Sequence, residues 1–353
     1  MTDYKSLRAI DLLRELSLAF GPSGCEGNVA DIIKENIAPF ADEILTDRMG
    51  SVIALYKGSG EASDNLSRLM LSAHMDEVGF MVKSIDGDGY IKMTPLSGRD
   101  PKTLVGRNVT IGDETRKISG YIGVKPAHLG GSGNYDSLYV DIGAKNKEDA
   151  EAHVKVGDFG TYRSDFVRFG KNGAMIKGKA LDDRLGCTVL CETLRRLSES
   201  GTRLPYDIYF AFTCREEIGS SGALTAANKI EPDMAIVFEA TAVADVDGVE
   251  KNSRVAEQGK GGCISFMDNG TIYDEELYQL ILETGKKNGI PCQPKQYIAG
   301  GNDAGHIHKS RAGVRCAAIS APARYIHTAS NVVRESDFFA ICDLIQAVMQ
   351  ELA

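Results

Sequence analysis

Histidine and carboxylate side chains follow stretches typical of buried strands at several separate places in the sequence. In the first, His74 closes the apolar run Leu69-Met70-Leu71, and Asp76 comes two residues later. Alternate strand residues point to the same face, so this spacing suits a metal-bound imidazole whose other ring nitrogen is held by a carboxylate. A buried structural His–Asp pair would show the same pattern, so this segment alone leaves both interpretations open.

Two adjacent aspartates, Asp182 and Asp183, open a segment of helical character over residues 183–199. Aspartates at a helix start commonly cap free backbone N–H groups and interact favourably with the helix dipole. The alternative interpretation is that one of the two carboxylates bridges a pair of metal ions.

Further acidic residues end two apolar stretches in the second half of the chain. Glu216 and Glu217 follow a strand expected over residues 206–214, at the end where ligand sites form in open α/β sheets, although a solvated loop would also account for them. Glu239 ends another apolar strand, and a glutamate there is seldom buried unless it is paired or bound. His327 is the last candidate of this kind.

Taken together, these side chains form a set of imidazole and carboxylate donors. That set favours zinc, cobalt or manganese over an iron–sulfur or copper(I) centre. The chain has eight cysteines, but no CxxC pair. The apolar surroundings of most of them indicate reduced, buried side chains of a cytoplasmic protein.

The pattern of apolar residues predicts two kinds of domain in this chain of 353 residues. Helices and strands alternate at both ends, whereas residues 77–177 contain short segments separated by turn signals such as Asp86-Gly87-Asp88-Gly89. We therefore expect an α/β domain into which a small β-barrel is inserted. The expected helices are two within 4–40, then 147–152, 183–199, 219–228, 274–288 and 336–352, and the expected strands are 44–56, 68–73, 206–214 and 234–239.

Charge and hydropathy exclude some classes of partner. The formal net charge is −9, whereas nucleic-acid binding needs clustered lysine and arginine. No apolar run approaches the roughly 20 residues of a membrane span, and the charges throughout MTDYKSLRAIDLLREL argue against a signal peptide. These features predict a cytoplasmic protein without nucleic-acid or membrane partners.

Four motifs connect the candidate residues to a known family. They are AHMDEVGFMV at 73–82, KALDDRLG at 179–186, EEIGSSGA at 216–223 and ARYIH at 323–327. On these motifs the sequence resembles the glutamyl and deblocking aminopeptidases, which are related to the self-compartmentalising tetrahedral aminopeptidases and include members named M-type endoglucanases. The motifs run in the family's order and span most of the chain.

The resemblance implies a fold and an assembly. The expected fold is the three-layer α/β catalytic domain of a dimetal peptidase, formed by residues 1–76 and 178–353, with an inserted β-barrel-like dimerisation domain over residues 77–177. The expected partners are peptide substrates and further copies of the chain, in a homo-oligomer that would be a dodecamer or a dimer.

The resemblance also implies a ligand for each position of a two-metal site. Two divalent metal ions would be bound per chain, with zinc expected before cobalt or manganese. His74 would bind one ion and His327 the other, and Asp182 would bridge them. Glu217 and Glu239 would complete the two sites.

The same resemblance assigns the neighbouring acids. Glu216 would be the general base that acts on a water shared by the two ions, Asp76 would orient His74, and Asp183 would be a neighbour rather than a ligand. The implied activity is an aminopeptidase that hydrolyses N-terminal residues from peptides.

Two positions depart from the family pattern. Glu239 stands where the family usually has aspartate, and related two-metal hydrolases use this position in selecting a free amine or a free carboxylate end. The segment 328–331 (TASN) follows His327 where the family often has Ser-Pro-x-Glu, so a carboxylate that supports the histidine is missing.

Other functions remain open at this level: a metal-dependent carboxypeptidase or deacylase, a non-catalytic assembly-forming relative with a degenerate site, or a glycoside hydrolase using Glu216 and Glu217. The last fits less well, because adjacent strand residues point to opposite faces and sugar hydrolysis needs facing carboxylates roughly 5–10 Å apart. The chain also lacks tryptophan, which is common in sugar-stacking sites. A loop at 300–305 (GGNDAG) is expected near the substrate pocket, with a plain turn or a helix cap as its alternative.

Overall fold

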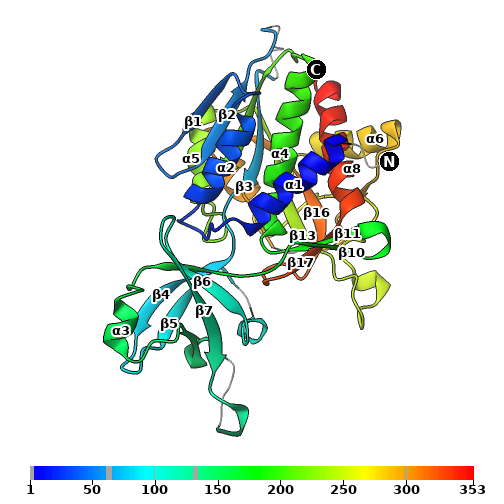
Figure 1. Ribbon diagram of the computed structural model, residues 1–353. Helices are drawn as coiled ribbons and strands as arrows, with labels where there is room; N and C mark the ends of the chain where they lie inside the picture. The colour runs from blue at the N-terminus through cyan, green and yellow to red at the C-terminus, as the bar shows by residue number, and fades with distance from the viewer. Residues whose placement is uncertain (1–3, 61–65, 99, 130–133, 299) are drawn as a thin grey trace.

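The computed structural model describes residues 4–60, 66–98, 100–129, 134–298 and 300–353. Within these residues the strands form two sheets, one large and mixed and the other closed into a barrel. Figure 1 shows the large sheet and its helices in the upper part of the molecule, with the barrel below them. The predicted fold class, an α/β domain carrying an inserted small β-barrel, is confirmed.

The large sheet has the spatial order β1-β2-β12-β3-β13-β16-β17-β11-β10, and β14 joins it beside β16 and in turn pairs with β15. Its strands are β1 (Glu43–Thr46), β2 (Val52–Tyr56), β3 (Arg68–His74), β10 (Val167–Phe169), β11 (Met175–Gly178), β12 (Asp207–Thr213), β13 (Met234–Ala242), β14 (Gly262–Ile264), β15 (Cys292–Pro294), β16 (Arg315–Arg324) and β17 (Asn331–Arg334).

Four central strands of this sheet, β3, β12, β13 and β16, run parallel to one another. They are apolar along most of their length because both faces of the sheet are covered; in β3, for example, Leu69, Met70 and Leu71 are all fully buried. Since the strands share one direction, their carboxyl ends meet at one edge of the sheet. Residues that follow these strands are therefore brought together there.

Helices cover the two faces of the sheet and complete three layers. The main apolar core lies under α1 (Tyr4–Leu18), α2 (Gly27–Ile37), α4 (Leu181–Ser200), α6 (Glu275–Asn288) and α8 (Glu335–Glu351), and a smaller core lies under α5 (Ser221–Ile230) and α7 (Ala304–Ile307). Every helix predicted from residue 147 onward is present within two residues of its expected bounds. No helix in the described ranges is long and apolar enough to cross a membrane.

One central strand, β16, was not predicted. Its sequence RCAAISAPAR is rich in alanine, which has a low preference for strands. Burial on both faces favours the strand nevertheless, because Ala317, Ala318 and Ile319 are fully buried between the two helical layers.

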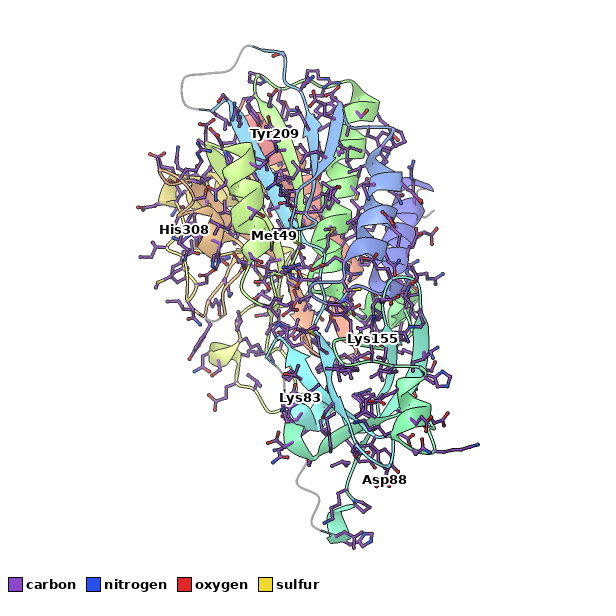
Figure 2. All side chains as sticks on the ribbon, turned by 90° about the vertical axis from the view of Figure 1, so that its left-hand side faces the viewer. Met49, Lys83, Asp88, Lys155, Tyr209 and His308 are labelled. Carbon is purple, nitrogen blue, oxygen red and sulfur yellow. The ribbon has the colours of Figure 1, made fainter. Side chains whose placement is uncertain are left out.

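The barrel closes in the order β4-β5-β8-β7-β6-β9. Its strands are β4 (Gly79–Ile85), β5 (Ile91–Leu96), β6 (Asn108–Gly112), β7 (Lys117–Val124), β8 (Leu138–Asp141) and β9 (Phe159–Tyr162), and α3 (Lys147–Glu151) lies beside them. In Figure 2, Lys83, Asp88 and Lys155 mark the barrel, while Tyr209 in β12 lies toward the opposite end of the molecule.

The predicted end of the inserted domain, at residue 177, falls within β11. Both β10 and β11 pair with the large sheet rather than with the barrel, whose last strand ends at Tyr162. We therefore propose that the inserted domain ends in the segment 163–166. The sequence predicts the boundary at residue 177 because residues 167–177 form short alternating segments, and short edge strands show this pattern in either domain.

Candidate metal centre

The predicted metal ligands reach one edge of the large sheet from separate elements. His74 is the last residue of β3, Glu217 lies in the turn after β12, and Glu239 lies within β13. Asp182 stands at the start of α4, and His327 follows β16. The structure brings all of these side chains together.

Asp182 occupies the middle of the site because its two carboxylate oxygens face different histidines. Oδ1 lies 3.4 Å from Nε2 of His74, and Oδ2 lies 3.5 Å from Nε2 of His327. Glu239 Oε1 is 3.4 Å from the same nitrogen of His74, and Glu217 Oε2 is 3.7 Å from that of His327. Two triads of donors therefore share one carboxylate. The first triad is His74, Asp182 and Glu239, and the second triad is Asp182, Glu217 and His327.

The buried carboxylates of the two triads are suited to binding cations. Within the described part of the chain, Asp182 Oδ1 and Glu217 Oε1 are buried without a hydrogen-bond partner, which is costly for carboxylate oxygens. Burial and the adjacent charge of Asp182 raise the pKa of Glu217 to about 7. Burial likewise raises the pKa of Glu239 well above its usual range. Imidazole and carboxylate donors in this arrangement fit divalent zinc, cobalt or manganese.

Each histidine is held through its other ring nitrogen. Nδ1 of His74 lies 3.1 Å from the backbone oxygen of Asp76 and 3.5 Å from its carboxylate. Nδ1 of His327 lies 3.0 Å from the backbone oxygen of Gly98, in the loop after β5 of the barrel. A carbonyl acceptor favours the tautomer with a proton on Nδ1, which leaves Nε2 available for a metal. The inserted domain thus supplies the support for His327 that the segment 328–331 lacks.

Asp76 also fixes the turn that carries the paired glutamates. Its carboxylate accepts hydrogen bonds from the backbone N–H groups of Glu216, at 2.9 Å, and Glu217, at 3.1 Å. The hydroxyl of Ser23 donates a third bond at 2.6 Å. Asp76 is fully buried, so it is placed to orient both His74 and this turn.

Glu216 shares the cavity of the site but belongs to neither triad. A cavity of about 570 Å³ is lined by Glu216 together with Asp182, Glu217, Glu239 and His327. The donor groups that could hold an ion include Glu217, whereas Glu216 is outside both of them. Burial, with the charges of nearby acids, raises the pKa of Glu216 well above its usual range. A carboxyl group in this setting can accept or donate a proton in the cavity.

Asp183 has features of both interpretations considered for the aspartate pair. Its Oδ1 accepts the backbone N–H of Gly186 at 3.0 Å, in the manner of a helix-capping aspartate. One of its oxygens also lies within 4.8 Å of donor atoms of His74 and Glu239. Asp183 therefore also lies where it could contact an ion held by the first triad.

Several residues of the cavity wall had no role assigned from the sequence. Lys295 and Asp268 line the cavity. Asp303 follows the wall residue Asn302 but does not line the cavity itself; it accepts a hydrogen bond from the hydroxyl of Thr213, and its Oδ1 is buried without a partner in the described part of the chain. The loop at 300–305, which was expected near the substrate pocket, contributes its first three residues to the wall. The roles of Lys295 and Asp268 could not be predicted, because nothing in the local sequence distinguishes a lysine or aspartate of the wall from an ordinary surface residue.

Comparison with known proteins places the chain in a family. Residues 50–344 match the family model described as M42 glutamyl aminopeptidase. The match covers most of the chain, so the chain belongs to the M42 glutamyl aminopeptidase family. The resemblance carried by the four sequence motifs is confirmed.

Individual relatives agree with this assignment. A lysyl aminopeptidase of Pyrococcus furiosus is 32% identical over 352 residues, which cover 97% of this chain and 97% of that one. The solved structure of a TET aminopeptidase from a marine sediment Thaumarchaeota archaeon is 34% identical, with a TM-score of 0.93 and coverage of 98% and 97%. A TET peptidase of Pyrococcus horikoshii, which can assemble into a tetrahedron or a large octahedral shell, is 31% identical with a TM-score of 0.83 and coverage of 97% and 99%.

Proposed function

We propose that this chain is a two-metal aminopeptidase that removes residues from the N-terminus of peptides. Its family makes it a hydrolase that acts on peptide bonds. The observation that carries the two-metal part of the proposal is the position of Asp182, whose two oxygens lie 3.4 Å and 3.5 Å from the imidazoles of His74 and His327.

The two triads would each hold one divalent ion. His74, Asp182 and Glu239 would bind the first, and Asp182, Glu217 and His327 the second, with zinc expected before cobalt or manganese. Such ions, when bound, supply Lewis acidity and a water that loses a proton near neutral pH.

Glu216 would serve as the general base. Its side chain reaches the cavity without belonging to a triad, so its carboxylate is free to accept a proton from the attacking water and pass it to the leaving amine. The hydrogen bond from its backbone N–H to Asp76 holds it beside Glu217. Asp76 thereby positions the base as well as His74.

The charge of the cavity supports recognition of a free amine. Glu216 and Asp268 line it and belong to neither triad, whereas Glu217 and Glu239 would be neutralised by the bound ions. Lys295 is the one lysine or arginine among the described lining residues. Such a wall attracts a protonated α-amine and disfavours the carboxylate of a peptide C-terminus. Glu239 keeps the negative charge of the aspartate that the family usually has there.

The assay that tests this function compares three kinds of substrate on the metal-loaded protein. Aminoacyl chromogenic substrates with a free amine should be cleaved, whereas their N-acetylated forms should not. Release of C-terminal residues from N-blocked peptides would instead identify a carboxypeptidase, and release of acetate from the N-acetylated forms a deacylase; either result would show that the proposal is wrong.

We also propose that the chain forms a homo-oligomer in which the barrel is a contact domain. The TET peptidase of Pyrococcus horikoshii, a structural relative, can assemble into a tetrahedron or a large octahedral shell. The barrel of this chain exposes large apolar side chains, Tyr121, Leu129 and Val156, and such residues commonly mark protein interfaces. Light scattering would distinguish a dodecamer from a dimer, and a monomer at micromolar concentration would contradict the proposal.

A further inference from the structure

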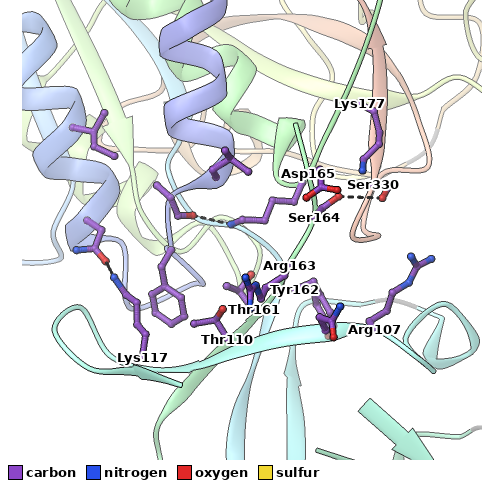
Figure 3. Close-up of a pocket in the computed structure, with 17 residues that line it drawn as sticks. Arg107, Thr110, Lys117, Thr161, Tyr162, Arg163, Ser164, Asp165, Lys177 and Ser330 are labelled. Carbon is purple, nitrogen blue, oxygen red and sulfur yellow. Dashed lines mark hydrogen bonds between the residues drawn. The ribbon is translucent and has the colours of Figure 1, made fainter. Parts of the chain in front are cut away.

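A second cavity, of about 910 Å³, lies between the barrel and the large-sheet domain. Figure 3 shows the end of α1 and α2 above it and barrel strands below it. This inter-domain cavity shares no lining residue with the catalytic cavity. The two are nonetheless close along the chain, because Lys179 lines the inter-domain cavity and Asp182 the catalytic one.

The wall of the inter-domain cavity is strongly basic. Four of its basic side chains form no ion pair with a carboxylate of the described residues: Arg107, Lys117, Arg163 and Lys177. Lys117 instead contacts the side-chain oxygen of Asn28 at 2.6 Å. Lys179 is different, because its ammonium group is paired with Glu77 at 2.5 Å. Asp165 is the one carboxylate among the described lining residues.

A buried hydroxyl group belongs to the same wall. Thr161 of β9 pairs with Thr110 of β6, and both line the inter-domain cavity. Thr161 is 2% exposed, and its Oγ1 has no hydrogen-bond partner among the described residues. A buried hydroxyl without a partner costs free energy, so this group indicates a polar ligand independently of the basic side chains.

The upper wall of the inter-domain cavity is apolar. Leu18, Phe20 and Ile32 line it where α1 ends and α2 passes. The volume falls within the range of pockets that bind small molecules. The cavity therefore offers cations and hydroxyl groups on one wall and apolar contact on the other.

We propose that this inter-domain cavity binds a small molecule that carries a multivalent oxyanion, a phosphate ester or a polycarboxylate. Arginine presents paired donors that match the oxygens of phosphate and carboxylate groups, and lysine adds a point charge. Repulsion among the unpaired cations is relieved by such a ligand, in a chain whose overall charge of −9 would otherwise repel anions. The hydroxyl of Thr161 is covered in the free protein, so it donates to the same oxyanion once the side chains over it shift, and the rest of the ligand packs against Phe20.

Calorimetric titration of the metal-loaded protein tests this assignment, with inorganic phosphate and tricarballylate as separate probes. At least one probe should bind saturably, and the better one identifies the oxyanion class. The double variant R107Q/K177Q removes two charge-assisted contacts and should bind it roughly tenfold or more weakly, which corresponds to about 1.4 kcal/mol or more. The variant T161V should show a smaller loss.

The matched control is K83Q/K155Q, which removes two exposed charges of barrel residues that do not line the inter-domain cavity. It should change the affinity less than about twofold. Affinity that is unchanged in R107Q/K177Q would place the anion elsewhere, including at the catalytic metals, and would overturn the proposal. Failure of both probes to bind the wild-type protein would overturn it as well. Because the readout is binding, neither result depends on peptidase activity.

Discussion

The catalytic cavity and the inter-domain cavity hold opposite unbalanced charges, although the same two chain segments contribute to both. Residues 177–182 give Lys177 and Lys179 to the inter-domain cavity and Asp182 to the catalytic one. Residues 327–330 are divided in the same way, since His327 lines the catalytic cavity and Ser330 the other. A few residues of backbone thus separate a basic wall from an acidic one.

The difference between the two cavities shows how an unbalanced charge identifies a ligand. Outside the two cavities a buried charge can be paired within the protein, as Arg195 is with Glu192 at 2.6 Å. In the catalytic cavity, one buried carboxylate oxygen of Asp182 and one of Glu217 have no hydrogen-bond partner among the described residues. Buried carboxylates without a partner are expected to be neutralised by cations that bind in the catalytic cavity. The cations of the inter-domain cavity are mostly exposed, and they attract anions through their combined field.

Removal of bound metal should have the largest effect on the catalytic cavity and none that depends on the inter-domain cavity. Dialysis against a strong chelator should abolish hydrolysis of an aminoacyl chromogenic substrate, because the acids of the catalytic cavity supply no Lewis acid of their own. Addition of zinc or cobalt should restore the rate. Full activity in a sample that elemental analysis shows to be metal-free would contradict this account.

Exchange of single glutamates should separate proton transfer from metal binding. Glu216→Gln should keep the metal content of the wild type but lose roughly 10²–10⁴-fold in kcat, the usual contribution of an acid–base group. The matched variant Glu217→Gln should instead lower the metal content, because it removes a charged ligand from the second triad. Elemental analysis and initial rates measure both effects. Unchanged turnover in Glu216→Gln would reject the role of Glu216 as base.

The buried ion pair of Lys179 with Glu77, at the wall of the inter-domain cavity, leads to a prediction about stability. Glu77→Gln should lower the free energy of unfolding by about 3–5 kcal/mol, since it leaves the charge of Lys179 buried without its carboxylate. Arg184, which is fully buried 3.8 Å from Glu77, should add to the effect. Urea unfolding measures it. The exposed Glu35→Gln serves as control and should have almost no effect, and equal stability of the two variants would show that the pair is not important.

The departure at Glu239 leads to the smallest predicted effect. Glu239→Asp shortens the side chain whose oxygen lies 3.4 Å from His74 Nε2. In this backbone the aspartate should reach the first triad less well and weaken one metal site by roughly tenfold, or about 1.4 kcal/mol. The second site, through His327, should be unaffected. Metal titration resolves the two affinities, and equal weakening of both sites would show that they are not separable.

Much of the fold and of the site could be predicted from the sequence. The apolar strands and the amphipathic helices gave the α/β class, and the short segments after Asp76 gave the barrel. His74, Asp182 and Glu217 stood in motifs at element ends, where parallel strands bring their side chains together. Their convergence therefore required only the fold to be right.

Features that depend on contacts between distant segments could not be predicted. The carbonyl of Gly98 supports His327 from a different domain, and no local pattern records that contact. The same is true of the inter-domain cavity, whose basic side chains belong to segments as distant as Arg107 and Lys177. In the sequence, charged residues of this kind have the pattern of ordinary solvent-exposed residues, and their common position becomes visible only when the two domains are placed against each other.

Anomalous X-ray diffraction from crystals of the zinc-loaded protein would test the central claim most directly. The account predicts two peaks per chain, one among His74, Asp182 and Glu239 and the other among Asp182, Glu217 and His327, so that Asp182 contacts both. A single peak, or peaks that leave Asp182 uncoordinated, would contradict it.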